Sequence, residues 1–260
     1  MRAVRRGSGK PLLLVHGLGS SARNWDPVVP ALSAAREVVA VDLPGFAGEP
    51  AVSGPATIAA LTDALQQWIV AEGLAGVDVV GSSMGARMVL EMARRGHRGT
   101  VVSLDPGGFW TDVQAKVFGG SIKASVALVR TLQPVLPALA RSPVGRTALL
   151  AQFSARPWAL PADLVLTELR GFRRSVSPSL DSALDALANG PRQEGAPTGS
   201  LHGKVVIGWG RHDRVTLPSQ AARACAAFPD ATLHWFEESG HFPHWDSPDE
   251  TVDMILSSTA

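Results

Sequence analysis

The chain has 260 residues, of which 45% are hydrophobic and 18% charged, and this composition excludes a disordered chain and a coiled coil. Its 24 basic and 23 acidic side chains leave a formal net charge of +1, so no charge excess indicates binding to nucleic acid or to an anionic membrane. The single cysteine, Cys225, cannot form an intrachain disulfide or a thiolate metal site. We therefore expect a cytoplasmic protein with neither nucleic acid nor membrane as a partner.

The N-terminal residues have only part of the pattern of a signal peptide. Residues 1–6 are basic, but the apolar run that follows, 12–15, is four residues long. The apolar region of a signal peptide needs about 7–15 residues, and a membrane-spanning helix needs about 18–20. We expect neither export through this segment nor a membrane span.

Strand and helix patterns alternate in the first part of the chain. Short apolar runs predict buried strands, and apolar residues that recur every three or four positions predict the helices between them. Parallel strands need such crossover helices, so the alternation predicts a mostly parallel sheet with helices on both faces. In chain order, the predicted elements are a strand at 11–15, a helix at 24–34, a strand at 37–42, a helix at 58–71, a strand at 77–81, a helix at 84–95 and a strand at 100–104.

The alternation breaks at Pro106-Gly107-Gly108 and resumes after a stretch rich in proline, glycine and serine, 190–203. Between these points the sequence predicts only helices. We therefore expect an α/β core from 1–106 and 200–260, with a helical cap inserted at 107–199. The predicted cap helices are 123–132, 161–173 and 178–188, and the core continues with strands at 204–209 and 231–236 and helices at 217–227 and 248–257.

A G-x-S-x-G motif, Gly81-Ser-Ser-Met-Gly85, lies between a predicted strand and a predicted helix. A strained turn at this junction can lift a serine hydroxyl above the edge of the sheet, and the flanking glycines avoid collisions of Cβ atoms with neighbouring strands. An ordinary glycine-rich turn in a chain with 26 glycines would also produce the motif. Its position at the junction favours Ser83 as a nucleophile.

A serine nucleophile needs a base, and a third group must hold that base in position. Asp213 and His241 each follow a predicted strand in the last part of the chain. The order Ser83, Asp213, His241 is that of an α/β-hydrolase triad. Asp105 also follows a predicted strand, but Pro106 and two glycines come directly after it, which is typical of a turn out of the sheet. We therefore favour Asp213 over Asp105 as the acid.

Four further sequence blocks accompany these residues. They are His16-Gly-Leu-Gly19, Asp42-Leu-Pro-Gly45, the G-x-x-D-x-x-x-x-P pattern of 210–218, and Gly240-His241 followed by Asp246 and Pro248. With these blocks, which run from 16 to 248, the whole chain resembles the α/β-hydrolase superfamily, in its branch of small cap-bearing esterases and carbon–carbon hydrolases. The resemblance implies the α/β-hydrolase fold.

The chain departs from the family pattern in three places. Residues 47–49 replace the usual G-x-S, and Ser82 stands where His, Asn or Gln is frequent. Only ten residues precede Pro11, where two leading strands are usual. The first departure concerns the shape of a loop, and the last predicts a truncated edge of the sheet.

The resemblance implies a role for each residue of the triad. Ser83 would attack the substrate, His241 would take the proton and return it, and Asp213 would hold the imidazole. The backbone N–H groups of Leu18 and Met84 would form the oxyanion hole. The sequence has no H-E-x-x-H, Walker or dinucleotide motif, so we expect no metal and no cofactor. The expected partner is a small-molecule substrate, and the expected state is a monomer or a homodimer.

Three other histidine and tryptophan positions are expected to be structural. By the same resemblance, His16 braces the loop in which it lies. His244 and Trp245 closely follow His241, and for both we favour local packing over a place at the mouth of the pocket. None of the three is therefore expected to take part in the chemistry.

The reaction stays open at this point. The resemblance implies hydrolysis of an ester, lactone, thioester or vinylogous ketone, and the apolar faces of the predicted cap helices favour acyl or aryl substrates without net charge. The same triad supports perhydrolysis, cofactor-free haloperoxidation or a lyase reaction, and some relatives are ligand-sensing receptors with vestigial hydrolysis. A serine nucleophile and the absence of tyrosine argue against the haloalkane dehalogenases and epoxide hydrolases of this fold.

Overall fold

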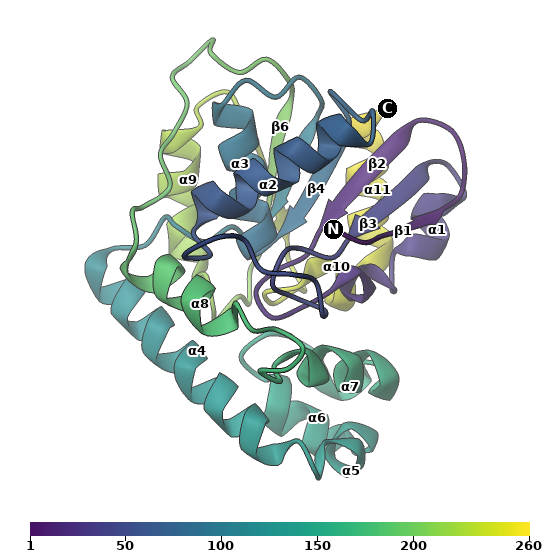
Figure 1. Cartoon of the computed structure of the whole chain (residues 1–260), viewed down its shortest axis with the longest axis vertical. Helices are drawn as coiled ribbons and strands as arrows, with labels where there is room; N and C mark the ends of the chain where they lie inside the picture. The colour runs from purple at the N-terminus through teal and green to yellow at the C-terminus, as the bar shows by residue number, and fades with distance from the viewer.

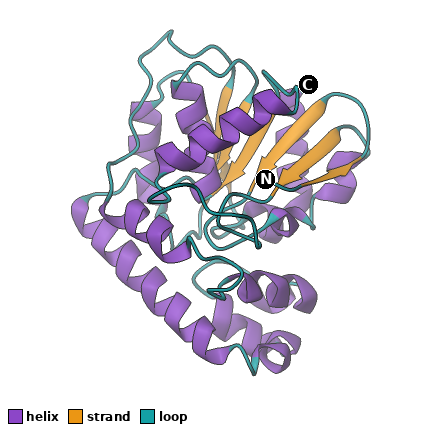
Figure 2. Cartoon of the chain, in the orientation of Figure 1, coloured by secondary structure: helices purple, strands orange, loops and turns teal.

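One sheet of seven strands, in the order β1-β3-β2-β4-β5-β6-β7, forms the centre of the computed structural model, which describes residues 1–260. Neighbouring strands are parallel except β1 and β3, and helices lie on both faces of the sheet (Figure 2). The predicted fold class, a mostly parallel sheet with an inserted helical region, is confirmed. The strands are β1 (Ala3–Arg6), β2 (Pro11–Val15), β3 (Glu37–Val41), β4 (Asp78–Ser82), β5 (Val101–Leu104), β6 (Val205–Gly210) and β7 (Thr232–Phe236).

The edge strand β1 is the one strand that the sequence did not predict. It pairs antiparallel with β3, and Ala3 lies opposite Val41. Three of its four residues are exposed, among them Arg5 and Arg6, so it lacks the apolar run that identifies a buried strand. The N-terminal residues therefore extend the sheet beyond the truncated edge that we expected.

The interior strands separate two hydrophobic cores. Leu13 and Val15 of β2 face one core, whereas Leu12 and Leu14 face the other, as the two-residue period of a strand requires. Both faces are buried, which explains the continuous apolar runs in the sequence. The first core contains residues of α2 (Ile58–Ala71), α3 (Met84–Arg94) and α9 (Ala221–Ala227), and the second contains residues of α1 (Val29–Ser33) and α11 (Pro248–Thr259).

A helical segment lies between β5 and β6, at the end of the sheet where the parallel strands have their carboxyl ends (Figure 1). Its helices are α4 (Asp112–Leu132), α5 (Leu136–Arg141), α6 (Pro143–Leu150), α7 (Ala162–Gly171) and α8 (Leu180–Asn189). Part of this segment forms a third core of its own. None of the helices in the chain combines the length and the apolar character needed to cross a lipid bilayer.

The helices differ from the prediction at four places, each for an identifiable reason. α4 begins at Asp112 instead of 123, because Thr111 and Gln114 form a capping box and the helix then tolerates Gly119 and Gly120. α5 and α6 were missed because each has a proline in its first turn, where the absent N–H needs no partner. The helix predicted at 24–34 is a 3-10 turn, η1 (Ala22–Trp25), followed by the short α1.

Candidate active site

Ser83 lies in a strained turn between β4 and α3. Its φ and ψ angles are 56° and −112°, and its backbone N–H donates to the carbonyl of Leu104. A Cβ atom at Gly81 would lie 2.3 Å from the Gly85 carbonyl oxygen, and one at Gly85 would lie 2.3 Å from the Val15 carbonyl oxygen. The two glycines of the motif are therefore a steric requirement of the turn, as the sequence predicted.

The structure brings Ser83, His241 and Asp213 together in a row. The Oγ atom of Ser83 lies 2.8 Å from Nε2 of His241, and Nδ1 of the same ring lies 2.9 Å from Oδ2 of Asp213. Ser83 and His241 are 158 positions apart in the sequence, so only the fold places them in contact. The side chains of Asp213 and His241 are buried, which shields their interaction from solvent.

Asp213 uses both carboxylate oxygens in hydrogen bonds. Oδ1 accepts from the backbone N–H groups of Val215 and Thr216, at 2.7 and 3.0 Å. Oδ2 accepts from the Thr216 hydroxyl at 2.6 Å and faces Nδ1 of His241. The carboxylate is therefore held rigidly by its own turn, and its last acceptor position is directed at the imidazole.

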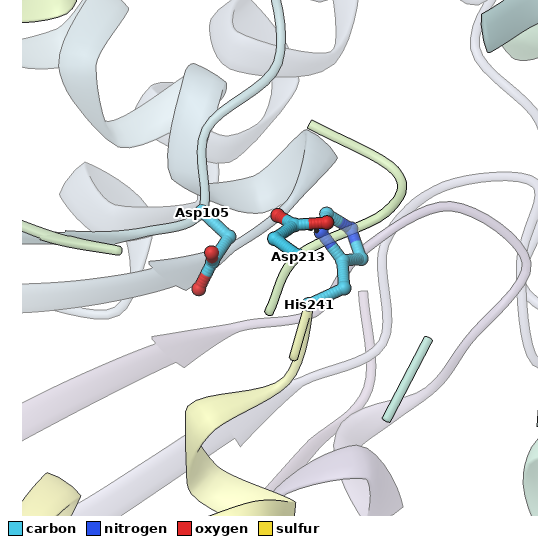
Figure 3. A group of neighbouring side chains, drawn as sticks. All are labelled: Asp105, Asp213 and His241. Carbon is cyan, nitrogen blue, oxygen red and sulfur yellow. Dashed lines mark hydrogen bonds and ion pairs between the residues drawn. The ribbon is translucent and has the colours of Figure 1, made fainter. Parts of the chain in front are cut away.

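Asp105, the competing acid, lies beside this row but does not contact the imidazole. Its Oδ1 accepts from the backbone N–H of Gly210 at 2.9 Å, and it forms no hydrogen bond to His241. Burial raises the pKa of Asp105 well above its usual range, and the negative charge of Asp213 raises it further. In Figure 3 the Asp213 carboxylate lies against the His241 ring, and the Asp105 carboxyl points away from it. A carboxyl whose pKa is raised in this way is poorly suited to stabilise an imidazolium.

Asp105, Asp213 and His241 also have the side chains of metal ligands, with one ligand atom from each lying within 4.8 Å of the others. The Asp213 oxygens and the His241 Nδ1 atom are already engaged in hydrogen bonds to protein groups. These bonds favour an acid–imidazole pair over a metal centre as the interpretation of this cluster.

The loop that carries His241 is fixed to the helical segment. The backbone N–H of His241 donates to the Phe153 carbonyl at 2.9 Å. The Asp246 carboxylate accepts from the Ser154 hydroxyl and from the backbone N–H groups of Ala155 and Gly240. The sequence identified Asp246 only as part of a motif, whereas the structure shows that it joins the His241 loop to the inserted segment.

The loop after β2 approaches Ser83 from the other side. A Cβ atom at Gly17 would lie 3.1 Å from the Cβ of Ser83, so only glycine allows this distance without displacing the serine. The backbone N–H of Leu18 donates no hydrogen bond within the protein. Met84 is the first residue of α3, where a backbone N–H has no partner inside the helix. The N–H groups of both predicted oxyanion donors are therefore without a partner within the protein.

His16 braces this loop. Its Nε2 accepts from the backbone N–H of Leu43 at 3.0 Å, and Nδ1 lies 2.7 Å from the Gly17 carbonyl oxygen, to which it donates. Burial lowers the pKa of His16 to about 4, so the ring is neutral at pH 7. This arrangement agrees with the structural role that the resemblance implied.

A cavity opens above Ser83 and His241 between the sheet and the helical segment. The volume of this cavity is about 160 Å³. That is roughly ten times the volume that one ordered water molecule needs. Of the 22 residues that line it, 15 are hydrophobic, and none is lysine or arginine. The apolar part of the lining includes Leu18, Phe118, Ile122, Leu128, Val129, Leu149, Phe153, Leu169, Phe172, Val215, Phe242 and Trp245.

The apolar faces of the predicted cap helices serve both the cavity and the cores. Leu128 lines the cavity, Val129 and Leu169 line it and also belong to a hydrophobic core, and Val126 and Leu164 pack only into cores. Trp245 also lines the cavity, with its ring N–H donating to the Asn24 carbonyl. Our preference for purely local packing of Trp245 was therefore incomplete.

His244 packs locally, as expected. The ring is fully buried against Trp25, and Nε2 lies 2.6 Å from the side-chain oxygen of Asn24. Burial lowers the pKa of His244 to about 3, so the ring stays neutral. This histidine supports the wall of the cavity without lining it.

Glu168 is a cavity residue that sequence reasoning missed. It lies on α7 with 5% of its surface exposed, and its Oε2 accepts from the Ser20 hydroxyl at 2.7 Å. Burial raises the pKa of Glu168 to about 7. A single glutamate on an amphipathic helix is usually assigned to the solvent-exposed face. The sequence therefore gave no indication that Glu168 lines the cavity.

Comparisons with known proteins place the chain among hydrolases and related proteins of similar length or longer. The chain is 27% identical over 259 residues to a dihydrolipoyllysine-residue acetyltransferase component of the acetoin cleaving system from Cupriavidus necator, covering 96% of this chain but only 64% of that relative's length. It is 26% identical over 255 residues to a 2-hydroxy-6-oxononadienedioate/2-hydroxy-6-oxononatrienedioate hydrolase from Pseudomonas putida, covering 94% and 86% of the two chains.

The structural and family comparisons cover nearly the whole chain. A solved esterase from Exiguobacterium antarcticum has the same fold, with a TM-score of 0.77 at 16% identity over 98% of this chain and 93% of that one. A family model described as "Alpha/beta hydrolase family" matches residues 12–254. The chain therefore belongs to the alpha/beta hydrolase family.

Proposed function

We propose that the protein is a serine hydrolase that cleaves mostly apolar carboxylic esters, without negative charge, through an acyl-enzyme on Ser83. The observation that carries this proposal is the row of contacts from Ser83 to His241 to Asp213, at 2.8 and 2.9 Å. A serine hydroxyl is a weak nucleophile, and an imidazole at hydrogen-bond distance, fixed in turn by a carboxylate, is what activates it.

In the proposed reaction, the Ser83 hydroxyl attacks the ester carbonyl while Nε2 of His241 takes its proton. The imidazolium then gives that proton to the leaving alcohol, and water repeats the sequence to release the acid. Asp213 holds Nδ1–H and stabilises the imidazolium. The backbone N–H groups of Leu18 and Met84 stabilise the oxyanion, and the loss of one such donor typically costs about 2.7–4 kcal/mol.

The lining of the cavity supports the choice of substrate. The segment 107–199 acts as a cap that shapes the cavity, and its contribution is mainly apolar. A carboxylate that enters an apolar site without a cationic partner loses its hydration without compensation. The Pseudomonas putida relative is named for a dienedioate, whereas this cavity has no lysine or arginine in its lining. We therefore place uncharged esters before acidic carbon–carbon substrates.

A burst experiment tests the proposal. p-Nitrophenyl esters of short and medium acyl chains should give a burst of p-nitrophenol equal to the enzyme concentration, or steady turnover if deacylation is fast. Ring-cleavage dienoates with one or two carboxylates, tested beside them, should give a kcat/KM lower by at least about 10²-fold. Higher activity on the dicarboxylate would contradict the substrate class. A single turnover that then stops would indicate a ligand-sensing receptor instead of an enzyme.

A further inference from the structure

Glu168 is the one acidic residue in the lining of the cavity. Its Oε2 accepts from the Ser20 hydroxyl, and the Asn24 amide also lies beside the carboxylate, although Oε1 has no partner at good hydrogen-bond geometry. An ionised carboxylate offers about four acceptor positions, and the Ser20 hydroxyl and the nearby Asn24 amide leave some of them unfilled. Glu168 also forms no ion pair with a lysine or arginine, which is the usual partner of a buried carboxylate.

The surroundings of Glu168 decide its charge. Burial raises its pKa to about 7, while the Ser20 hydroxyl and the nearby Asn24 amide favour the ionised form. Asp26 and Arg23, on the segment that packs against α7, act in opposite directions. The carboxyl is therefore neutral below about pH 7 and charged above it. Whether neutral or ionised, the Glu168 carboxyl can form further hydrogen bonds.

A structural role does not explain this arrangement. A buried carboxyl with no cationic partner and with unfilled acceptor positions is destabilising compared with an apolar side chain of similar size. The packing around it is nevertheless tight: a Cβ atom at Gly171 would lie 2.4 Å from the Gly19 carbonyl oxygen. α7 is thereby held against the loop that carries Ser20, and the carboxyl is held in position beside the cavity.

We propose that Glu168 and Ser20 form a polar subsite that binds a hydrogen-bond donor of the substrate, a hydroxyl or an ammonium group, and that rejects a carboxylate at the same place. The inference rests on the proposed function, because it specifies which esters the enzyme prefers. It makes Glu168 a residue that determines specificity and has no part in the bond cleavage itself.

The test uses p-nitrophenyl esters of linear acids whose far end carries a methyl, hydroxyl, ammonium or carboxylate group, in a series of chain lengths. The measured quantity is the ratio of kcat/KM between a substituted and a methyl-ended ester in one enzyme preparation, which is independent of how much protein has folded. At the chain length that reaches the subsite, wild type should prefer the hydroxyl or ammonium ester by at least about tenfold and should disfavour the carboxylate.

Two substitutions separate charge from hydrogen bonding. Glu168→Leu should abolish both preferences and improve the relative rate of the carboxylate ester. Glu168→Gln should keep the hydroxyl preference, because the amide oxygen still accepts, but should lose the ammonium preference. In wild type the ammonium preference should increase as pH rises through about 7, and in Glu168→Gln it should be flat. Glu238→Gln, the same change at an exposed glutamate outside the cavity lining, is the matched control and should leave the ratios as in wild type.

Equal ratios in wild type and Glu168→Leu would overturn the subsite, whatever the absolute rates. The methyl-ended ester reports separately on the proposed function. If no ester is hydrolysed at all, calorimetric Kd values of the same esters, measured with Ser83→Ala and with Ser83→Ala/Glu168→Leu, give the corresponding ratios. A tenfold hydroxyl preference that depends on Glu168 supports the subsite, and its absence in both measurements contradicts it.

Discussion

Ser83→Ala should lower kcat for ester hydrolysis by about 10⁴–10⁶-fold, because removal of a triad member leaves only binding and oxyanion stabilisation. The change removes one oxygen atom, and that oxygen has a single hydrogen-bond partner, His241. Alanine can occupy the same strained backbone with the same Cβ atom. We therefore expect the folded structure to persist.

Steady-state kinetics on a p-nitrophenyl ester, with circular dichroism and thermal unfolding as controls for folding, measures this effect. Ser82→Ala is the matched control, since Ser82 is the preceding residue and its buried hydroxyl has no hydrogen-bond partner. Turnover close to wild type in purified, folded Ser83→Ala would remove Ser83 as the nucleophile.

Asp213→Asn should lower kcat by roughly 10⁴-fold, whereas Asp105→Asn should stay within about tenfold of wild type. At position 213 both oxygens accept hydrogen bonds, and Oδ2 faces the Thr216 hydroxyl and Nδ1 of His241. An amide N–H₂ group there would meet a donor, or would require the imidazole to carry its proton on Nε2. That tautomer cannot accept the proton of Ser83.

An asparagine at position 105 should preserve the one hydrogen bond that the Asp105 side chain makes. Burial raises the pKa of Asp105 and so favours its neutral form, which an amide resembles, and the amide oxygen can still accept from the Gly210 N–H. Parallel measurement of kcat/KM for the two variants separates the two acids. A collapse of activity in Asp105→Asn, with Asp213→Asn within tenfold of wild type, would mean that the third member of the triad is Asp105.

The sequence predicted the parts of the fold in which burial is complete. The strands β2, β4, β5 and β6 are mostly apolar and almost completely buried because both faces of the sheet are covered, and each was located within a residue or two. β1 escaped prediction because an edge strand that is mostly exposed has no such pattern. Tertiary pairing, and not local preference, decides that it is a strand.

The residues around Ser83 were predictable because each lies at the carboxyl end of a strand of one parallel sheet. That geometry brings Ser83, Asp213 and His241 to the same edge, whatever the length of chain between them. The lining of the cavity is different. Phe153, Glu168 and Trp245 reach it through the way the helical segment packs on the core, which no local pattern in the sequence encodes.

A sulfonyl fluoride that reacts with activated serines tests the central claim most directly. Ser83 is the only serine whose hydroxyl lies within hydrogen-bond distance of Nε2 of His241. The hydroxyl of the neighbouring Ser82 is buried in β4 and has no hydrogen-bond partner. Peptide mapping by mass spectrometry after reaction of the native protein should find one adduct, on Ser83, and Asp213→Asn should react far more slowly. An adduct on Ser82, or equal labelling of several serines in the native protein, would contradict the assignment of Ser83 as the nucleophile.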